Sequence, residues 1–160
     1  MTFEAIQTEY RGCLFRSRQE ARWAVCLDCL DITWCYEYEG FQFENGYRYL
    51  PDFLLPGRNL WLEVKGRKPT VGEFTNATLL AKHDRRPVVI TWENFEAATQ
   101  DHNLLFWYDD NGVFHTTQGW PWLKDPEPGW QAARMARFDR RPHPRPWLDW
   151  GNTEYGELPY

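Results

Sequence analysis

Residues 60 to 65 read Leu60-Trp61-Leu62-Glu63-Val64-Lys65, and this short stretch decides how the rest of the chain is interpreted. Alternate side chains of a β-strand point to opposite faces of its sheet. The apolar side chains at positions 60, 62 and 64 therefore share one face, while Glu63 and Lys65 project from the other. The pattern predicts a strand with one core face and with a carboxylate and an ammonium side by side on its second face.

A second acid, Asp52, precedes this strand. Asp52 closes a strand-like run within residues 46–55, and Pro56-Gly57-Arg58-Asn59 has the composition of a turn. A short antiparallel hairpin would bring Asp52 close to Glu63. Two carboxylates so placed offer the oxygen ligands that Mg²⁺ prefers, with water and substrate phosphate in the remaining positions. The alternative is an ordinary surface strand on which Glu63 and Lys65 are solvated.

A third acid, Glu20, lies in the segment from Ser17 to Leu30, which has helical periodicity. Glu20 stands at the start of the apolar stripe, where a carboxylate is costly unless a cation or hydrogen bonds meet it. A neighbouring metal ion would explain this position. Ser17 and Glu20 also match a Ser-x-x-Glu capping box, so helix capping is the alternative. Both roles can coexist only if the side chain turns inward.

Pro51-Asp52 and Glu63-Val64-Lys65 resemble the motif of the PD-(D/E)xK nuclease superfamily. Over residues 10 to 95 the chain looks most similar to the branch with a helical glutamate before the motif. That branch includes resolvase-like and transposon-end-cleaving nucleases and small phage and bacterial proteins. The resemblance implies an α/β fold with a restriction endonuclease-like core in the order αβββαβ and a mixed central sheet.

The same resemblance implies a set of site residues. Its catalytic residues would be Glu20, Asp52, Glu63 and Lys65, with Lys65 orienting or helping to deprotonate the attacking water. Its metal site, for Mg²⁺ or Mn²⁺, would comprise Glu20, Asp52, Glu63 and Val64.

The remaining segments fit this order. Residues 32–38 and 87–92 have strand composition, and residues 70–83 predict a helix with a modest apolar stripe through Val71, Phe74, Thr78 and Ala81. A helix between two strands permits a parallel crossover in a covered sheet. We expect residues 1–100 to form the nuclease core of a single domain, with residues 101–160 as an extension packed on it.

That extension is rich in tryptophan and proline. Residues 107–115 predict a hairpin whose turn is Asp110-Asn111-Gly112, and residues 131–138 predict one short helix. Prolines interrupt the rest. Two interpretations are open for its tryptophans, which either pack over the core or stack on unpaired bases, and packing is favoured. They are Trp120, Trp122, Trp130, Trp147 and Trp150.

The formal net charge of −5 argues at first against a nucleic-acid partner, but the basic residues are clustered. Clusters occur around the Glu20 helix, after the 60–65 strand, at residues 82–86 and at residues 134–145. They predict a basic track around an acidic, metal-filled centre, against the alternative that each cluster is a solvated surface. The predicted nucleic-acid contacts are Arg16, Arg18, Arg22, Arg67 and Lys68.

The four cysteines fall in the first quarter of the chain, and Cys26 and Cys29 have C-x-x-C spacing. Because this pair lies within a predicted helix and no second close pair follows, small buried residues are favoured over a zinc site. No apolar run approaches the roughly 20 residues that span a bilayer. We expect a cytoplasmic protein that does not bind membranes, either bacterial or encoded by a phage.

Together these features predict a Mg²⁺-dependent deoxyribonuclease, an endonuclease that hydrolyses double-stranded or branched DNA with a metal-activated water. Two alternatives stay open. One is a non-catalytic module of phage or mobile-element origin that binds nucleic acid or a protein partner on the same fold. The other is a junction-resolving nuclease that acts as a homodimer, because two-fold symmetric substrates need paired sites.

Overall fold

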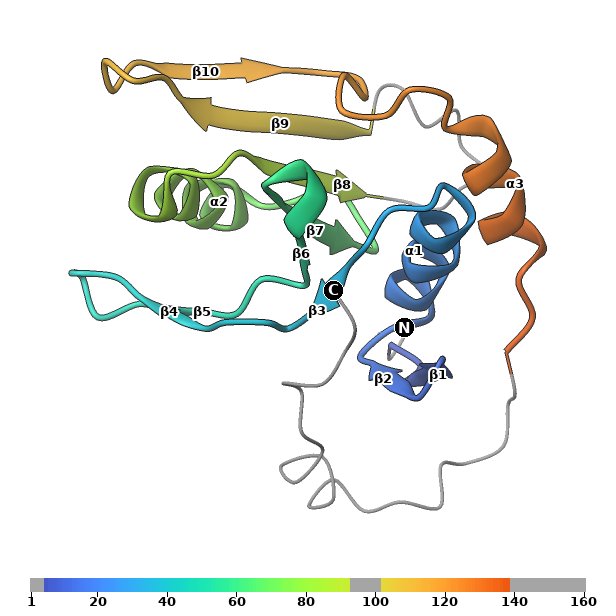
Figure 1. Ribbon diagram of the computed structural model, residues 1–160. Helices are drawn as coiled ribbons and strands as arrows, with labels where there is room; N and C mark the ends of the chain where they lie inside the picture. Colours follow the sequence, from blue (N-terminus) through green and yellow to red (C-terminus); the bar gives the residue numbers. More distant parts are fainter. Residues whose placement is uncertain (1–4, 93–101, 139–160) are drawn as a thin grey trace.

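A six-stranded mixed sheet forms the centre of the protein (Figure 1). The computed structural model describes residues 5–92 and 102–138. The strands lie in the order β10-β9-β8-β7-β6-β3. Their bounds are β3 Cys35–Tyr36, β6 Phe53–Leu55, β7 Leu60–Lys65, β8 Val88–Trp92, β9 Asn103–Tyr108 and β10 Phe114–Thr117. β7 and β8 are parallel, and every other neighbouring pair in this sheet is antiparallel. The predicted mixed α/β architecture is confirmed.

The predicted hairpin joins β6 to β7 through a 3₁₀ turn, Pro56–Arg58. Phe53 pairs with Leu62, and continuing that register places Asp52 opposite Glu63. Helix α2, Val71–Asp84, then crosses over to β8. With helix α1, Arg18–Cys29, these elements follow one another in the order α1, β3, β6, β7, α2, β8, with a separate two-stranded hairpin inserted between β3 and β6.

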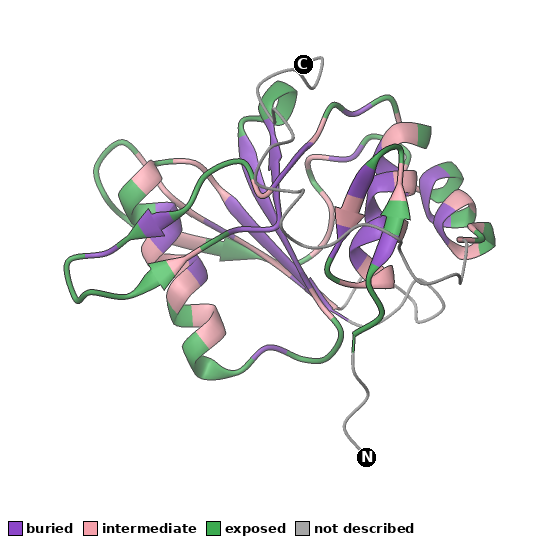
Figure 2. Cartoon of the chain, turned by 90° about the horizontal axis from the view of Figure 1, so that it is seen from below, coloured by how far each residue is buried: buried purple, intermediate pink, exposed green. Residues whose placement is uncertain are grey.

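Helices cover both faces of the sheet, with α1 and α3 (Glu127–Met135) on one side and α2 on the other (Figure 1). On the first side Ala24 and Leu27 of α1 share an apolar core with Leu62 of β7. On the second side Leu80 of α2 shares a separate core with Trp61. Buried residues accordingly run along the sheet and along the helix sides that face it (Figure 2). Strand β7 is thus covered on both faces.

Both long helices are capped at their N-termini by a hydroxyl side chain. The Ser17 hydroxyl caps α1 by accepting a hydrogen bond from the Glu20 amide, and Thr70 forms a full capping box with Glu73 at α2. Both helices therefore begin where the sequence predicts. The predicted stripe of α2 is wrong at Val71, which is 83% exposed. The helix instead faces the sheet through Ala77, Leu80 and Ala81, since small side chains let it approach the strands closely.

Two predicted strands are shorter than expected. The run at 46–55 is split, because β5 (Arg48–Tyr49) pairs with β4 (Phe41–Gln42) in a separate hairpin before β6 begins. Pro51 lies in the gap, where it has no amide hydrogen to give to a ladder. In the 32–38 run only β3 is paired, and the chain leaves it at Glu37, which has a φ of 49°. A further hairpin, β1 (Thr8–Tyr10) with β2 (Cys13–Phe15), precedes α1.

The C-terminal part continues the sheet. β9 and β10 form the predicted hairpin, with Gly112 at a φ of 77° in its turn. Because β9 also pairs with β8, the sheet runs across the boundary expected at residue 100. Helix α3 spans residues 127–135 rather than the predicted 131–138. Pro126 is its N-cap and Pro128 stands in its first turn, where no amide hydrogen is needed.

The tryptophans of this part that the structure describes pack on the protein. Trp130 is a buried member of the core between α1 and α3, and Trp120 and Trp122 pack against that core. The rings of Trp23 and Trp120 lie 5.3 Å apart. The packing interpretation is therefore confirmed for these three residues, whereas Trp147 and Trp150 lie outside the described residues.

Candidate metal centre

Asp52 and Glu63 face one another where β6 begins and β7 approaches its end. Both are almost fully buried, at 3% and 1% exposed. The Val64 amide donates a hydrogen bond of 2.7 Å to Asp52 Oδ2, which holds this carboxylate against β7. Lys65 Nζ lies 3.2 Å from Glu63 Oε2. The structure thus brings together three of the predicted site residues, and a solvated surface strand does not describe Glu63.

The two buried carboxylates repel each other, although Lys65 and Arg16 offset part of their charge. Burial, and next the charge of Glu63, raise the pKa of Asp52 well above its ordinary value of 3.8. Burial, the nearby charge of Glu63 and hydrogen bonding between the Tyr49 hydroxyl and that carboxylate also raise the pKa of Tyr49. Glu63 Oε1 is buried, and within the described residues it forms no hydrogen bond. A buried carboxylate oxygen without a donor is the position at which a cation is expected.

Arg16, in the connection between β2 and α1, neutralises part of the negative charge of Asp52. Its Nη2 atom lies 2.7 Å from Asp52 Oδ1, and its Nε atom lies 2.7 Å from Glu37 Oε1. Burial alone would lower the pKa of the guanidinium, but the charge of Asp52 and the other acceptors around it raise that pKa. Arg16 was predicted as a contact to nucleic acid. In this structure its side chain instead contacts the cluster around Asp52 and Glu63, which we call the acid centre.

Glu20 turns inward from the first turn of α1 and is 6% exposed. Its Oε1 atom accepts a 2.8 Å hydrogen bond from the Ser17 hydroxyl, and its Oε2 atom accepts one from the Tyr36 hydroxyl. Burial, and next the charge of Asp52, raise the pKa of Glu20. Helix capping by Ser17 and an inward carboxylate therefore coexist. Tyr36 links Glu20 to Arg16, whose amide donates a 3.0 Å hydrogen bond to the same hydroxyl.

Whether these residues fit a divalent ion depends on their oxygen atoms. Among residues 5–92 and 102–138, no group of three or more His, Cys, Asp or Glu side chains is arranged to hold a metal ion. The protein ligands on offer are therefore the two carboxylates of Asp52 and Glu63. Mg²⁺ is commonly held by one or two carboxylates, with waters and substrate phosphate completing its octahedron. Glu63 Oε1 supplies a free ligand position, whereas both oxygens of Asp52 are engaged by Arg16 and the Val64 amide. The donor set fits Mg²⁺ or Mn²⁺ on the condition that an oxygen of Asp52 is released.

The remaining predicted metal residues stand around this pair. The Val64 side chain is part of the core under α1, so only the backbone of Val64 can take part, and its amide already serves Asp52. Glu20 is held by Ser17 and Tyr36 and stays a predicted ligand.

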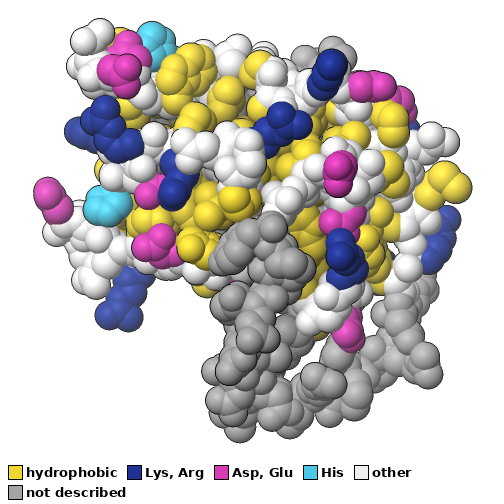
Figure 3. All heavy atoms as spheres, viewed as in Figure 1, with side chains coloured by type: hydrophobic (Ala, Val, Ile, Leu, Met, Phe, Trp, Pro, Cys, Tyr) yellow, Lys and Arg dark blue, Asp and Glu magenta, His cyan; other side chains and the backbone are white. Residues whose placement is uncertain are grey.

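The predicted nucleic-acid contacts other than Arg16 lie on α1 and just after β7. Arg67 forms a 3.0 Å ion pair with Glu73 at the start of α2, and its side chain is 65% exposed. Arg18 and Arg22 are half-buried on α1, and Lys68 is exposed. On the face seen in Figure 3, lysine and arginine side chains are dispersed among acidic and apolar ones. A continuous basic track stays a prediction.

Sequence reasoning missed Tyr36, Glu37 and Tyr49 as parts of this centre. Tyr36 pairs with Phe53 across β3 and β6, and the Glu37 amide donates a 2.8 Å hydrogen bond to the Asp52 carbonyl. The signal was present, because the residues from 32 to 38 alternate like a strand. What the sequence did not indicate was the neighbour of that strand, and hence that Tyr36 and Glu37 would flank Asp52.

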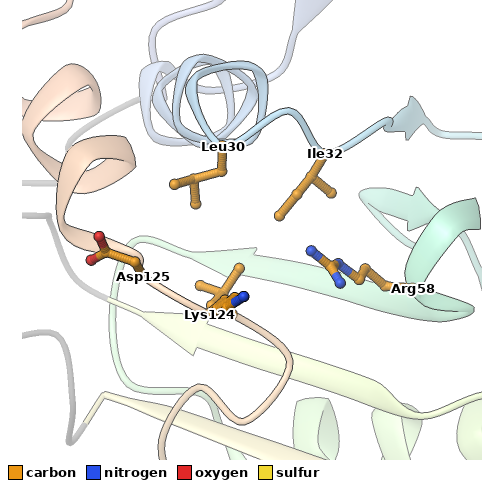
Figure 4. A pocket seen from close by; sticks show the side chains of 6 residues that line it. Leu30, Ile32, Arg58, Lys124 and Asp125 are labelled. Carbon is orange, nitrogen blue, oxygen red and sulfur yellow. The ribbon is translucent and has the colours of Figure 1, made fainter.

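A pocket of about 370 Å³ lies apart from the acid centre, at the far end of both α1 and the β6–β7 hairpin (Figure 4). Arg58 points into it from the hairpin turn, and Leu30 and Ile32 point into it from the end of α1 (Figure 4). Its other lining residues are Leu123, Lys124 and Asp125. Asp52, Glu63 and Lys65 do not line this pocket, so it does not belong to the candidate metal centre.

All four cysteines are free thiols. Cys13, Cys26 and Cys35 are buried, and burial raises the pKa of Cys26 to about 12. Burial of these three agrees with the favoured interpretation of small buried residues, whereas that interpretation is wrong for Cys29, which is exposed. Among the described residues, no helix combines the length and the apolar character needed to cross a membrane.

Comparisons with protein-family models, with curated proteins and with solved structures find no match to this chain.

Proposed function

We propose that this protein is a Mg²⁺-dependent deoxyribonuclease with a restriction endonuclease-like core, which cuts DNA internally by attack of water on a phosphodiester. One observation carries the proposal. Two buried carboxylates, Asp52 and Glu63, stand opposite each other with Lys65 Nζ 3.2 Å from the second, and Glu63 Oε1 forms no hydrogen bond among the described residues. The chain order of α1, β3, β6, β7, α2 and β8 supports the proposed core.

The charge balance supports a metal ion. Burying two carboxylates side by side costs free energy unless cations and donors satisfy them. Another acid shows what a satisfied carboxylate is like in this protein. Asp84 Oδ2 accepts a 2.6 Å hydrogen bond from Trp61 Nε1 and pairs with Arg86 at 2.8 Å. Lys65 pairs with Glu63 Oε2, but the buried Oε1 atom has no donor among the described residues, and a divalent ion would supply the missing partner.

In this proposal Asp52 and Glu63 hold the ion. Glu20, which accepts a hydrogen bond from the Tyr36 hydroxyl, extends the acid centre. When bound, Mg²⁺ or Mn²⁺ supplies Lewis acidity toward the phosphoryl oxygen and lowers the pKa of a bound water. The exposed cations after β7, Arg67 and Lys68, are then candidates for contacts to the DNA backbone.

Lys65 acts as a positive charge in this scheme rather than as a base. Burial alone would lower its pKa, but the charges of Glu63 and Asp52 outweigh burial and raise it. The ammonium therefore stays protonated at neutral pH. It offers positive charge where the transition state accumulates negative charge, which is the type of stabilisation that contributes most in many enzymes.

The test is a cleavage assay with matched variants. Wild type, Asp52→Asn, Glu63→Gln and the control Asp84→Asn are incubated with linear, supercoiled, single-stranded and branched DNA in Mg²⁺, Mn²⁺ or EDTA. We expect metal-dependent cleavage by wild type and by the control, and none by the two centre variants. Absence of cleavage by folded wild type on every substrate would overturn the proposal.

A second candidate has one observation in its favour. The Asp52 carboxylate is already met by Arg16 and by the Val64 amide without any metal ion. A non-catalytic module that binds nucleic acid or a protein would use this acid cluster only to hold its fold. Such a module has no need of divalent ions, so calorimetric titration with Mn²⁺ separates the two candidates. Folded wild type that neither binds Mn²⁺ nor cleaves DNA would favour the module.

A further inference from the structure

We infer that Arg16 is a resident counter-ion which competes with the divalent ion for Asp52 and which, once displaced, binds a phosphate of the DNA. The inference rests on the proposed function. It concerns what the guanidinium does in the two states of the centre, metal-free and metal-bound.

The competition follows from which oxygen of Asp52 each group uses. The Val64 amide donates to Oδ2 at 2.7 Å, so Oδ1 is the oxygen left for an ion, and Arg16 Nη2 lies 2.7 Å from it. A divalent ion on Oδ1 would meet a guanidinium at the same atom, and two cations at this distance repel each other. Metal binding therefore has to displace Arg16, and the apparent metal affinity is lowered by the free energy of that displacement.

The position of Arg16 allows its side chain to leave without disturbing the fold. Its amide is fixed by a 3.0 Å hydrogen bond to the Tyr36 hydroxyl, whereas its side chain is 47% exposed. The guanidinium has two further partners, Glu37, which is only half-buried, and the Tyr36 hydroxyl, to which its Nε atom donates a long hydrogen bond of 3.4 Å. A rotation of the side chain therefore moves the charge from the buried carboxylate to the surface while the backbone stays in place.

The displaced guanidinium would lie at the rim of the metal site, where substrate phosphate has to enter. Its planar fork of donors matches two oxygens of one phosphate, which a lysine cannot do. Metal ion and DNA would then favour each other's binding. By linkage, the factor by which the ion tightens DNA binding equals the factor by which DNA tightens ion binding.

Two binding measurements without catalysis test this inference. The proteins are wild type, Arg16→Ala, Arg16→Gln and the control Arg58→Ala, which removes an arginine from the turn at the far end of the β6–β7 hairpin. Isothermal titration calorimetry gives the Kd for Mn²⁺ without DNA. Fluorescence anisotropy gives the Kd for a labelled duplex in EDTA and in Ca²⁺, which is used as a non-cleaving ion.

We expect the Arg16 variants to bind Mn²⁺ at least about tenfold more tightly than wild type, because the competing cation is gone. In Ca²⁺ their duplex affinity should fall about tenfold, the loss of one charge-assisted bidentate contact. Wild type should bind the duplex more tightly in Ca²⁺ than in EDTA, and Arg58→Ala should bind Mn²⁺ like wild type. Arg16→Gln keeps a donor for Asp52 and stands in for Arg16→Ala if the latter does not fold.

Unchanged or weaker Mn²⁺ binding by folded Arg16 variants would overturn the inference and make Arg16 a structural partner of Asp52. That result leaves the proposed function intact if wild type binds Mn²⁺ and cleaves DNA. The proposed function fails separately, and takes the inference with it, if neither wild type nor the Arg16 variants bind Mn²⁺.

Discussion

The two faces of strand β7 are buried equally well but are built differently. Leu62 is fully buried on the face covered by α1, and Glu63 is 1% exposed on the face toward α2. The side chains of the first face, Leu60, Leu62 and Val64, all belong to one apolar core. The second carries Trp61 in an apolar core at one end and the carboxylate of Glu63, beside Lys65, at the other.

This difference separates stability from function. Burial of Leu62 stabilises the fold through apolar surface removed from water. Burial of Glu63 next to Asp52 opposes folding, as the raised pKa of Asp52 indicates, and nothing in the packing requires an acid there. A feature that lowers stability and persists at a defined geometry is the kind expected at a functional site.

The largest expected effect comes from a substitution on the second face of β7, the polar face that carries Glu63 and Lys65. Glu63→Gln keeps the shape of the side chain and removes its charge, so metal-dependent cleavage should fall by at least about 1000-fold, equivalent to about 4 kcal/mol in the barrier. The free energy of unfolding in EDTA should not fall, because one of two adjacent buried charges has been removed. Single-turnover cleavage and urea unfolding measure the two effects. Loss of stability together with full cleavage would reverse our assignment of the two faces.

The matching change on the apolar face is Leu62→Ala. Leu62 is fully buried between α1 and the sheet, so its truncation should cost about 2–5 kcal/mol of the free energy of unfolding. Cleavage per folded molecule should stay close to that of wild type. Urea unfolding, with activity measured at a temperature where the variant is folded, checks both. A large drop in activity per folded molecule would mean that the two faces are coupled.

Most of what carries this comparison could be predicted from the sequence because it depends on local rules. The alternation in residues 60–65 fixed which side chains share a face, and the turn at 56–59 fixed the register that sets Asp52 opposite Glu63. Thr70 and Ser17 marked the starts of both long helices. Each of these signals spans only a few residues, so it survives without knowledge of the tertiary fold.

What could not be predicted depends on contacts between distant segments. The sequence does not distinguish Arg16 from several other arginines expected at the surface. Arg16 is a counter-ion of Asp52 only because the fold places the segment before α1 next to that carboxylate. Val71 reads as part of an apolar stripe, but the way α2 lies on the sheet leaves it exposed. The pairing of β9 with β8, which extends the sheet beyond residue 100, also has no local signal.

A smaller effect concerns pH. The raised pKa values of Asp52 and Glu20 mean that the folded protein binds protons more tightly at these groups than the unfolded chain does. In EDTA the free energy of unfolding should therefore fall as the pH rises, from near the ordinary values of 3.8 and 4.5 up to the raised pKa values. The slope is at most about 1.4 kcal/mol per pH unit for each group. Saturating Mg²⁺ should make the free energy of unfolding less dependent on pH, because the bound ion stabilises the ionised carboxylates.

Urea unfolding between pH 4 and 8 measures this slope, and Glu63→Gln is the control, since it removes the charge that helps to raise the pKa of Asp52. A free energy of unfolding that rises with pH in EDTA would contradict the charge assignment of the polar face.

The smallest effect tests whether α1 contributes to both faces of β7. Its apolar side chains cover the first face, while Glu20 in its first turn reaches the acid centre. Ser17→Ala and Thr70→Ala each remove a helix cap, and each should cost about 1 kcal/mol of the free energy of unfolding. Ser17→Ala also removes the hydroxyl that donates to Glu20 Oε1.

Only the Ser17 variant should then change metal binding, by about tenfold in the Kd for Mn²⁺, as expected for a group that orients a ligand. Thr70 caps a helix whose Glu73 is half-buried and paired with Arg67, so Thr70→Ala corrects for the general cost of losing a cap. If the two variants lose equal stability and bind Mn²⁺ like wild type, Glu20 acts in α1 as a capped first-turn residue and the metal site consists of Asp52 and Glu63 alone. If only Ser17→Ala weakens Mn²⁺ binding, the buried turn of Glu20 toward Tyr36 is part of the site, and α1 serves both faces of β7.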